Sequence, residues 1–254
     1  AGEAWIGAVC RLAVTRSVRD TALVLDCISG LQPGDPYTAP PPARPFVDEV
    51  GADPGRLRVG FTTASADPNV VTHPECVHGV TEAFLSAWGV WVATDVDELG
   101  RLCGEPITEA GVEPGTWAVA ELGRTVGGIA YLDAVATLHA YGRALAPFWT
   151  DPGGVHLLLT PTLPEPPPPL GQFAAQPDNP LVGLFRTASL VPFVAPFNMS
   201  GQPAISLPMH VSADGLPVGV QLVASLGRED LLLRVGSQVE QAAPWSDRVP
   251  TVHA

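Results

Sequence analysis

Residues 192–208 read PFVAPFNMSGQPAISLP, a stretch that passes from turn-forming residues into an apolar run. Asn198 and Gly201 are typical of a turn, because both residue types tolerate left-handed backbone conformations. From Ala204 to Val211 the side chains are mostly apolar, which predicts a strand. Such a strand needs partners, and the flanking sequence supplies them.

The sequence after this strand predicts a hairpin and a closing helix. Turn residues at positions 213–215 separate the strand from a second apolar run at residues 218–224, which begins within DGLPVGVQLV (residues 214–223). Residues 228–242, which contain DLLLR, carry apolar side chains at helical spacing. The helix residues that we expect to be buried are Leu231, Leu232, Val235 and Val239.

The sequence before residue 192 predicts another strand and a helical segment. Residues 155–160 form a mostly apolar run interrupted by His156, as expected of a strand covered on both faces. Residues 116–149 look helical in two pieces, broken at Gly127 and Gly128. One face of the second piece collects Leu132, Val135, Leu138, Gly142, Leu145 and Trp149.

The N-terminal region predicts an amphipathic helix over residues 15–29. Ser17 and Asp20 have the spacing of a capping box, in which the Ser oxygen accepts from an amide of the first turn. Val18 lies on the expected apolar face, and Gly30 ends the helix.

A crossover unit is predicted next in the sequence. Residues 56–61 alternate as a short strand, and a helix with Thr72 and Glu75 as its capping box runs to Gly89. Residues 90–96 return as a strand, so a parallel pair would make a right-handed strand–helix–strand unit. With no repeat and no clear linker, the pattern favours one α/β domain or part of one.

Charge and hydropathy argue against two classes of partner. The formal net charge is −13 and the pI about 4.7, so a polyanion would be repelled and we expect no nucleic-acid partner. No apolar run approaches the roughly 18 residues of a membrane span, and we expect a cytoplasmic protein. The four cysteines are expected to be buried free thiols rather than disulfide or zinc ligands: Cys10, Cys27, Cys76 and Cys103.

Common catalytic and metal-binding motifs do not occur in the sequence. It contains no G-x-S-x-G, P-loop, G-x-G-x-x-G or H-E-x-x-H motif. His73 and His78 are five residues apart, which is off the spacing that places two imidazoles on one helix side. The acidic cluster of Asp95, Asp97 and Glu98 is interpreted as a solvated loop, and His139 as an ordinary helix residue. We therefore predict neither a metal nor a cofactor.

Four segments together resemble the amidase signature family, the serine amidohydrolases that use a Ser–cis-Ser–Lys triad. Residues 192–208 are similar to its C-terminal signature, LLLTPTL at residues 157–163 to a strand end, and TRSVRD at residues 15–20 to a helix. APWSDR at residues 243–248 is similar to family C-termini, whereas residues 97–130 match poorly. The matched segments follow the family's order over most of the chain.

The resemblance implies an α/β/α fold with a mixed sheet flanked by helices. Residues 1–254 are then expected to be the C-terminal part of a single domain whose N-terminal half is missing. It also implies hydrolysis of the C–N bond of a small-molecule carboxamide. We expect binding of such a substrate only together with the missing half.

The family mechanism needs groups that this sequence lacks. Its Lys deprotonates the bridging cis-Ser, which activates the nucleophilic Ser, and both the Lys and the Gly/Ser-rich loop precede the TRSVRD helix. All thirteen basic residues here are Arg, and a guanidinium stays protonated near neutral pH. We therefore predict no catalytic residue, and interpret Ser200, Ser206 and Ser237 as turn, strand and helix-surface residues.

Six residues are candidates for the substrate pocket. By the resemblance, Phe193, Ala195, Phe197 and Asn198 line the acyl side. The alternative, that Asn198 and Gly201 shape a turn while both Phe side chains fill the core, stays open. Thr160 and Thr162 are candidates because α/β sheets place ligands at the carboxyl ends of strands.

Three hypotheses follow for the whole chain. The first is an amidase fragment, inactive alone, whose open sheet edge favours aggregation or homo-oligomerisation. The second is a non-catalytic structural or interaction module derived from an amidase. The third is a subunit of a transamidase complex, which nothing in the sequence selects.

Overall fold

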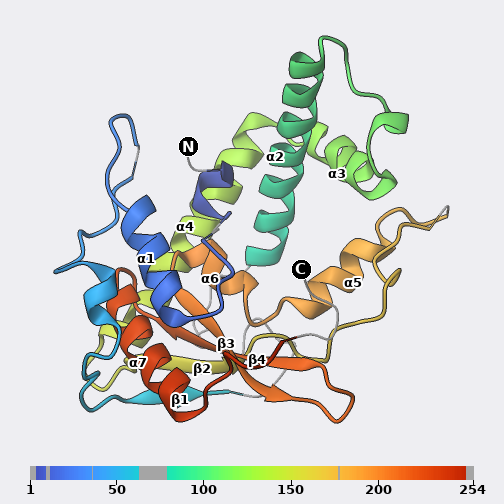
Figure 1. The fold of residues 1–254 in the computed structure, drawn as a ribbon. Helices are drawn as coiled ribbons and strands as arrows, with labels where there is room; N and C mark the ends of the chain where they lie inside the picture. Colours follow the sequence, from blue (N-terminus) through green and yellow to red (C-terminus); the bar gives the residue numbers. More distant parts are fainter. Residues whose placement is uncertain (1–3, 10–11, 36, 63–78, 177, 250–254) are drawn as a thin grey trace. The chain divides into compact units, whose positions relative to one another are not determined.

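The computed structural model describes residues 4–9, 12–35, 37–62, 79–176 and 178–249 (Figure 1). The chain divides into two compact units. The sheet unit comprises residues 1–63, 146–162 and 201–254, and the helical unit comprises residues 64–145 and 163–200. Each is described by itself.

The sheet unit is built on a mixed four-stranded sheet. Its strands are β1 (Val59–Phe61), β2 (Leu157–Pro161), β3 (Ala204–Val211) and β4 (Pro217–Ala224), in the order β1-β2-β4-β3. β1 and β2 are parallel, whereas β4 is antiparallel to both of its neighbours. The strands predicted around these positions and the α/β class with a mixed sheet are therefore confirmed.

Helices cover one face of this sheet. α1 (Val18–Ile28), the short η2 (Phe46–Glu49) and α7 (Glu229–Ala242) contact one another, and α7 contacts β3 and β4 (Figure 1). The core between helices and sheet consists of buried apolar side chains, among them Val18, Ala22, Phe46, Leu157, Leu207, Leu222, Leu231, Leu232 and Leu233. The predicted closing helix is confirmed, and its expected apolar residues belong to this core.

The start of α1 is held by its own cap and by the C-terminal tail. Ser17 Oγ accepts from the backbone N–H of Asp20 at 3.1 Å, so the predicted N-cap is confirmed. Glu240 of α7 accepts from the N–H of Val18 at 3.1 Å, and Trp245 Nε1 donates to the carbonyl of Arg16 at 3.0 Å. The TRSVRD and APWSDR segments therefore contact each other.

The helical unit contains most of the remaining helices. They are α2 (Val80–Cys103), η3 (Glu109–Gly111), α3 (Pro114–Arg124), α4 (Gly128–Thr150), α5 (Val182–Leu190) and α6 (Ala195–Ser200), with the last turn of α4 in the sheet unit. The short η1 (Ala4–Gly7) belongs to the sheet unit. The predicted break at Gly127 and Gly128 is confirmed, because α3 ends before it and α4 begins at Gly128.

The prediction of a strand at residues 90–96 is wrong. These residues continue α2, and Gly89 lies inside that helix instead of ending it. The strand that pairs in parallel with β1 is β2, which follows only after α2, α3 and α4. The capping box predicted at Thr72 and Glu75 lies outside the described residues.

Candidate functional site

A buried hydroxyl–amide pair lies on the face of the sheet opposite the apolar core. Thr160 of β2 and Gln221 of β4 are register partners, and Gln221 Nε2 donates to Thr160 Oγ1 at 3.0 Å. The two residues are 2% and 4% exposed. Side chains alternate along a strand, so Thr160 points away from the face on which Leu157 meets the helices. Two buried polar side chains thus satisfy each other by a hydrogen bond across the sheet.

A second hydroxyl pair lies at the carboxyl end of β2. Thr162 Oγ1 is 2.6 Å from Ser206 Oγ of β3, although β4 separates the two strands in the sheet. Gly219 of β4 makes this possible, since a Cβ there would lie 2.8 Å from both hydroxyl oxygens. Ser206 is exposed and Thr162 half-buried, so this pair is open to a polar ligand group.

The segment before β3 places the other predicted site residues in the helical unit. Phe193 and Phe197 are 1% and 3% exposed, and Ala195 begins the six-residue helix α6. Asn198 is exposed on that helix, and Gly201 follows it with a positive φ of 80°. Thr160 and Thr162 are brought together by β2, whereas Phe193, Ala195, Phe197 and Asn198 are brought together by α6 and its approach.

The three serines considered from the sequence occupy different settings. Ser206 is a strand residue as predicted, whereas Ser200 is the last residue of α6 and its Oγ donates to the carbonyl of Pro196 at 2.8 Å. Ser237 was predicted to lie on a helix surface, but it is 2% exposed. Its Oγ donates to the carbonyl of Arg234 at 2.9 Å and accepts from the N–H of Gly51 at 2.8 Å. This hydroxyl therefore fastens α7 to the loop after η2.

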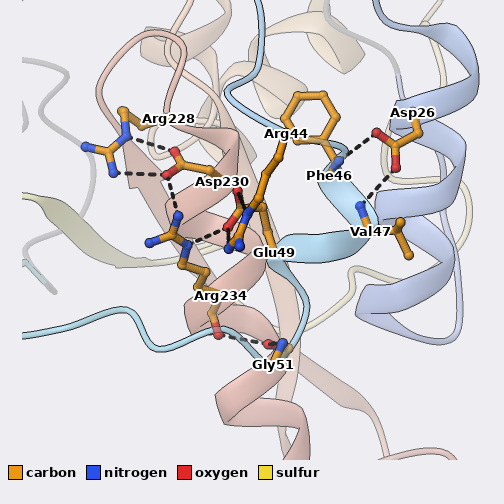
Figure 2. A network of polar contacts seen from close by, with 10 residues as sticks. Asp26, Arg44, Phe46, Val47, Glu49, Gly51, Arg228, Asp230 and Arg234 are labelled. Atoms are coloured by element: carbon orange, nitrogen blue, oxygen red, sulfur yellow. Dashed lines mark hydrogen bonds and ion pairs between the residues drawn. The ribbon is translucent and has the colours of Figure 1, made fainter.

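Two carboxylates and three guanidinium groups form a network that sequence reasoning missed (Figure 2). Glu49, 2% exposed, accepts from Arg44 Nε and Nη2 at 2.7 and 2.6 Å and from Arg234 Nε at 2.6 Å. Asp230 accepts from Arg228 Nε and Nη2 at 2.8 and 3.1 Å. Asp230 Oδ2 is also 3.5 Å from Arg234 Nη2, which joins the two carboxylates.

The electrostatics of this network suit a structural role. Hydrogen bonds from Arg44 and then from Arg234 hold the pKa of the Glu49 carboxyl at about 2, against the opposing effect of burial. The carboxylate therefore stays ionised near neutral pH and cannot serve as a general acid. Next to it, Asp26 of α1 accepts from the N–H groups of Phe46 and Val47 at 2.6 and 2.9 Å (Figure 2). Hydrogen bonds of these charged side chains therefore connect η2 to α1, through Asp26, and to α7, through Arg234.

Two further predictions are corrected by the structure. Cys27 and Cys103 are exposed free thiols and not buried ones, while Cys10 and Cys76 lie outside the described residues. The acidic cluster is helical and not a loop: Asp97 of α2 pairs with Arg124 at 2.7 Å, and Glu98 pairs with Arg101.

His139 lies on α4 and is exposed, as its interpretation requires. His73 and His78 lie outside the described residues. Within the described ranges, no group of three or more His, Cys, Asp or Glu side chains is placed to hold a metal ion. The described helices include none that combines the length and apolar character needed to cross a bilayer.

The matching family and two similar relatives are described as an amidase or as a cyclic-dimer hydrolase. The family described as Amidase matches residues 101–233. The chain is 37% identical over 267 residues to 6-aminohexanoate-cyclic-dimer hydrolase of Paenarthrobacter ureafaciens, covering 92% of this chain and 54% of that protein. It is 30% identical to the putative amidase AmiC of Mycobacterium tuberculosis (strain ATCC 25618 / H37Rv), covering 95% of this chain and 54% of AmiC.

Solved structures show the same relationship. A structure of 6-aminohexanoate cyclic dimer hydrolase complexed with substrate superposes with a TM-score of 0.82 at 35% identity, covering 93% of this chain and 55% of that one. A bacterial aryl acylamidase of the amidase signature family superposes with a TM-score of 0.67 at 18% identity, covering 91% and 52%, which shows the shared fold. The chain thus spans about half the length of the proteins that it matches.

Proposed function

Because this chain belongs to the amidase family, we propose that it forms the C-terminal part of an amidohydrolase that breaks carboxamide C–N bonds. The observation that carries the proposal is the 37% identity to 6-aminohexanoate-cyclic-dimer hydrolase over 92% of this chain. In this proposal residues 1–254 are part of a single catalytic domain. The sheet unit supplies part of its central sheet.

The catalytic groups must then come from outside these residues. The sequence contains no Lys, and Arg cannot release its proton to act as a base near neutral pH. Glu49 is ionised but fully engaged by Arg44 and Arg234, so it is no substitute. We therefore propose that the chain alone does not hydrolyse amides, and that its contribution is the binding of the substrate.

The substrate-binding role is assigned to the six residues selected from the sequence. Ala195, which is half-buried, offers apolar surface suited to the methylene groups of an aliphatic amide, and Asn198 offers an exposed amide group. Phe193 and Phe197 are 1% and 3% exposed, so their role in this proposal is to support that segment from the interior. Thr162, hydrogen-bonded to Ser206, offers a half-buried hydroxyl. Thr160 supports Thr162 from the interior, because the Thr160 hydroxyl already accepts a hydrogen bond from Gln221.

A small cyclic amide is the substrate class that the relatives favour. The proteins with 37% and 36% identity are both named for the 6-aminohexanoate cyclic dimer, a ring whose two amides are separated by methylene chains. Apolar side chains next to a few hydrogen-bonding groups suit such a ring. We propose this dimer, or a lactam of similar composition, as the substrate of the complete enzyme.

A chimera tests the proposal directly. The part of the Paenarthrobacter relative that aligns with this chain is replaced by residues 1–254, and primary amine released from the 6-aminohexanoate cyclic dimer is measured. We expect hydrolysis by the chimera and none by the isolated chain. A folded chimera that cleaves neither this dimer nor simple carboxamides would refute the role. Turnover by the isolated chain that serine-directed reagents abolish would refute its inactivity.

A further inference from the structure

Two hydroxyl groups meet across a strand that separates them. Neighbouring strands lie about 4.8 Å apart, so β2 and β3, with β4 between them, are roughly 10 Å apart. Thr162 Oγ1, at the end of β2, nevertheless lies 2.6 Å from Ser206 Oγ of β3. These two residues are called the Thr162–Ser206 pair below. A contact of this kind needs open space above the middle strand.

Gly219 of β4 provides that space. The N–H of Thr162 donates to the carbonyl of Gly219 at 3.1 Å, so the two residues are neighbours in the sheet. A Cβ at Gly219 would lie 2.8 Å from each hydroxyl oxygen, a distance that leaves no room for it. Gly219 does not adopt a positive φ. The need for Gly at this position therefore comes from the hydroxyl contact and not from the backbone conformation.

The strands on which the pair stands are held by a buried polar row. Thr160 and Ser206 are both register partners of Gln221. Gln221 Nε2 donates to Thr160 Oγ1 at 3.0 Å, and that hydroxyl donates to the carbonyl of Pro161 at 2.8 Å. The Thr160 hydroxyl is thus engaged as donor and as acceptor. The row fixes the end of β2, and with it the position of the Thr162 hydroxyl.

The Thr162–Ser206 pair keeps one O–H group for a ligand. A hydrogen bond between two hydroxyl groups uses one of their two hydrogens, and either oxygen can be the donor. Among the residues that the structure describes, neither oxygen has another hydrogen-bond partner. Thr162 is half-buried and Ser206 exposed, so the second O–H and the oxygen lone pairs are accessible.

A carboxamide matches this combination of groups. Its carbonyl accepts from the remaining O–H, and its N–H donates to a hydroxyl lone pair. A carboxylate offers no donor and an ammonium group no acceptor, so each satisfies only half of the pair. The net charge of −13 further disfavours a carboxylate ligand.

The pair suits an amide that stays intact rather than one that is cleaved. The carbonyl oxygen of a reacting amide gains negative charge and is stabilised by several hydrogen-bond donors aimed at it. The Thr162–Ser206 pair has one donor to offer, and the lone pairs of its oxygens would repel that charge. Binding of an unreacting amide requires no more than the pair provides.

We propose that the Thr162–Ser206 pair binds the intact amide of a substrate that has two amide groups, while the other amide is cleaved. The 6-aminohexanoate cyclic dimer, for which two relatives are named, contains two amides. Binding of the second amide selects this ring over a ring with a single amide. The inference rests on the proposed function for the cleavage itself.

Two rings test the inference in the chimera described above. One is the 6-aminohexanoate cyclic dimer, and the other is a lactam of the same ring size in which methylene groups replace the second amide. Ser206→Ala is expected to raise KM for the dimer by about fivefold with little change in kcat, because a neutral hydrogen bond to an unreacting group is lost. KM for the single-amide ring should not change. An equal rise for both rings, or no rise for the dimer, would refute the inference.

Three further variants separate the hydroxyl pair from general damage to the sheet. Gly219→Ala keeps both hydroxyls but forces them apart, and should raise KM for the dimer as Ser206→Ala does. Ser206→Thr restores a hydroxyl and should restore the KM of the unsubstituted chimera. Thr94→Ala is the control, since it removes an exposed hydroxyl that bonds only to the Val90 carbonyl of its own helix. It should change neither KM. Should Gly219→Ala not fold, the comparison of Ser206→Ala with Ser206→Thr decides, and a loss that Thr does not restore would contradict the pair.

This inference and the proposed function fail in different ways. A chimera that hydrolyses the dimer but loses affinity equally for both rings on Ser206→Ala would retain the proposed function and remove the inference. A folded chimera that hydrolyses nothing is titrated with both rings by calorimetry instead. Weaker binding of the dimer alone after Ser206→Ala would then retain the inference and remove the proposed function. Should the chimera not fold, residues 1–254 are co-expressed with the unmatched part of the relative, and failure of that complex to bind the dimer refutes the inference.

Discussion

Gly89 of α2 and Gly123 of α3 bring the backbones of two helices into direct contact. A Cβ on Gly123 would lie 1.9 Å from the carbonyl oxygen of Gly89, and one on Gly89 would lie 3.0 Å from the Cα of Gly123. Ala87 of α2 and Ala120 of α3 are also fully buried. The crossing therefore requires the absence of side chains at both positions.

Gly123→Ala is expected to destabilise the helical unit by about 2 kcal/mol or more, because its methyl group overlaps backbone atoms that cannot rotate away. Urea unfolding followed by far-UV circular dichroism measures the loss. Gly128→Ala is the control, since a Cβ at that helix start meets nothing within 4 Å. It should be neutral or slightly stabilising. Equal effects of the two substitutions would show that the close approach is not needed.

Thr160→Val removes the hydroxyl that accepts from Gln221 Nε2 in the interior while keeping the shape of the side chain. Because the lost acceptor is buried and water cannot replace it, we expect a loss of about 1–3 kcal/mol in urea unfolding. Thr162→Val is the matched control. Its hydroxyl is half-buried beside exposed Ser206, so its loss should cost clearly less. The reverse order would contradict this account of the polar face.

Local signals in the sequence predicted local structure well. The cap at Ser17 and Asp20 depends on residues three apart, and the β3–β4 hairpin depends on a turn with Gly215 at a positive φ of 81°. Both are decided by neighbouring residues and were found. Gly89 was interpreted as a helix end because Gly usually weakens a helix. Its real function depends on Gly123, thirty-four positions away in the sequence, and no local pattern reveals that.

The candidate site likewise contains residues that the sequence predicts and partners that only the fold brings close. Thr160 and Thr162 could be selected because they stand at the end of a predictable strand. Their partners Gln221 and Ser206 are 61 and 44 residues away, and only the strand order β2-β4-β3 brings them together. Glu49 was also missed: Arg44 is only five residues away, but Arg234, which ties Glu49 to α7, is 185 residues away. Long-range register, rather than composition, decides these contacts.

Glu49→Gln tests the charged network through pH. The pKa of the Glu49 carboxyl is about 2, below its ordinary value of 4.5, so its stabilising effect is complete above about pH 4.5 and is lost as the pH falls toward 2. At pH 7 the variant should lose about 2 kcal/mol of unfolding free energy, because Arg44 and Arg234 lose their charged acceptor. The difference from the unsubstituted chain should shrink steadily between about pH 4.5 and 2. Glu105→Gln, at an exposed residue outside the network, is the control and should show no such trend. A deficit for Glu49→Gln that stays constant from pH 7 to about pH 3 would mean that its carboxylate charge does not hold η2 in place.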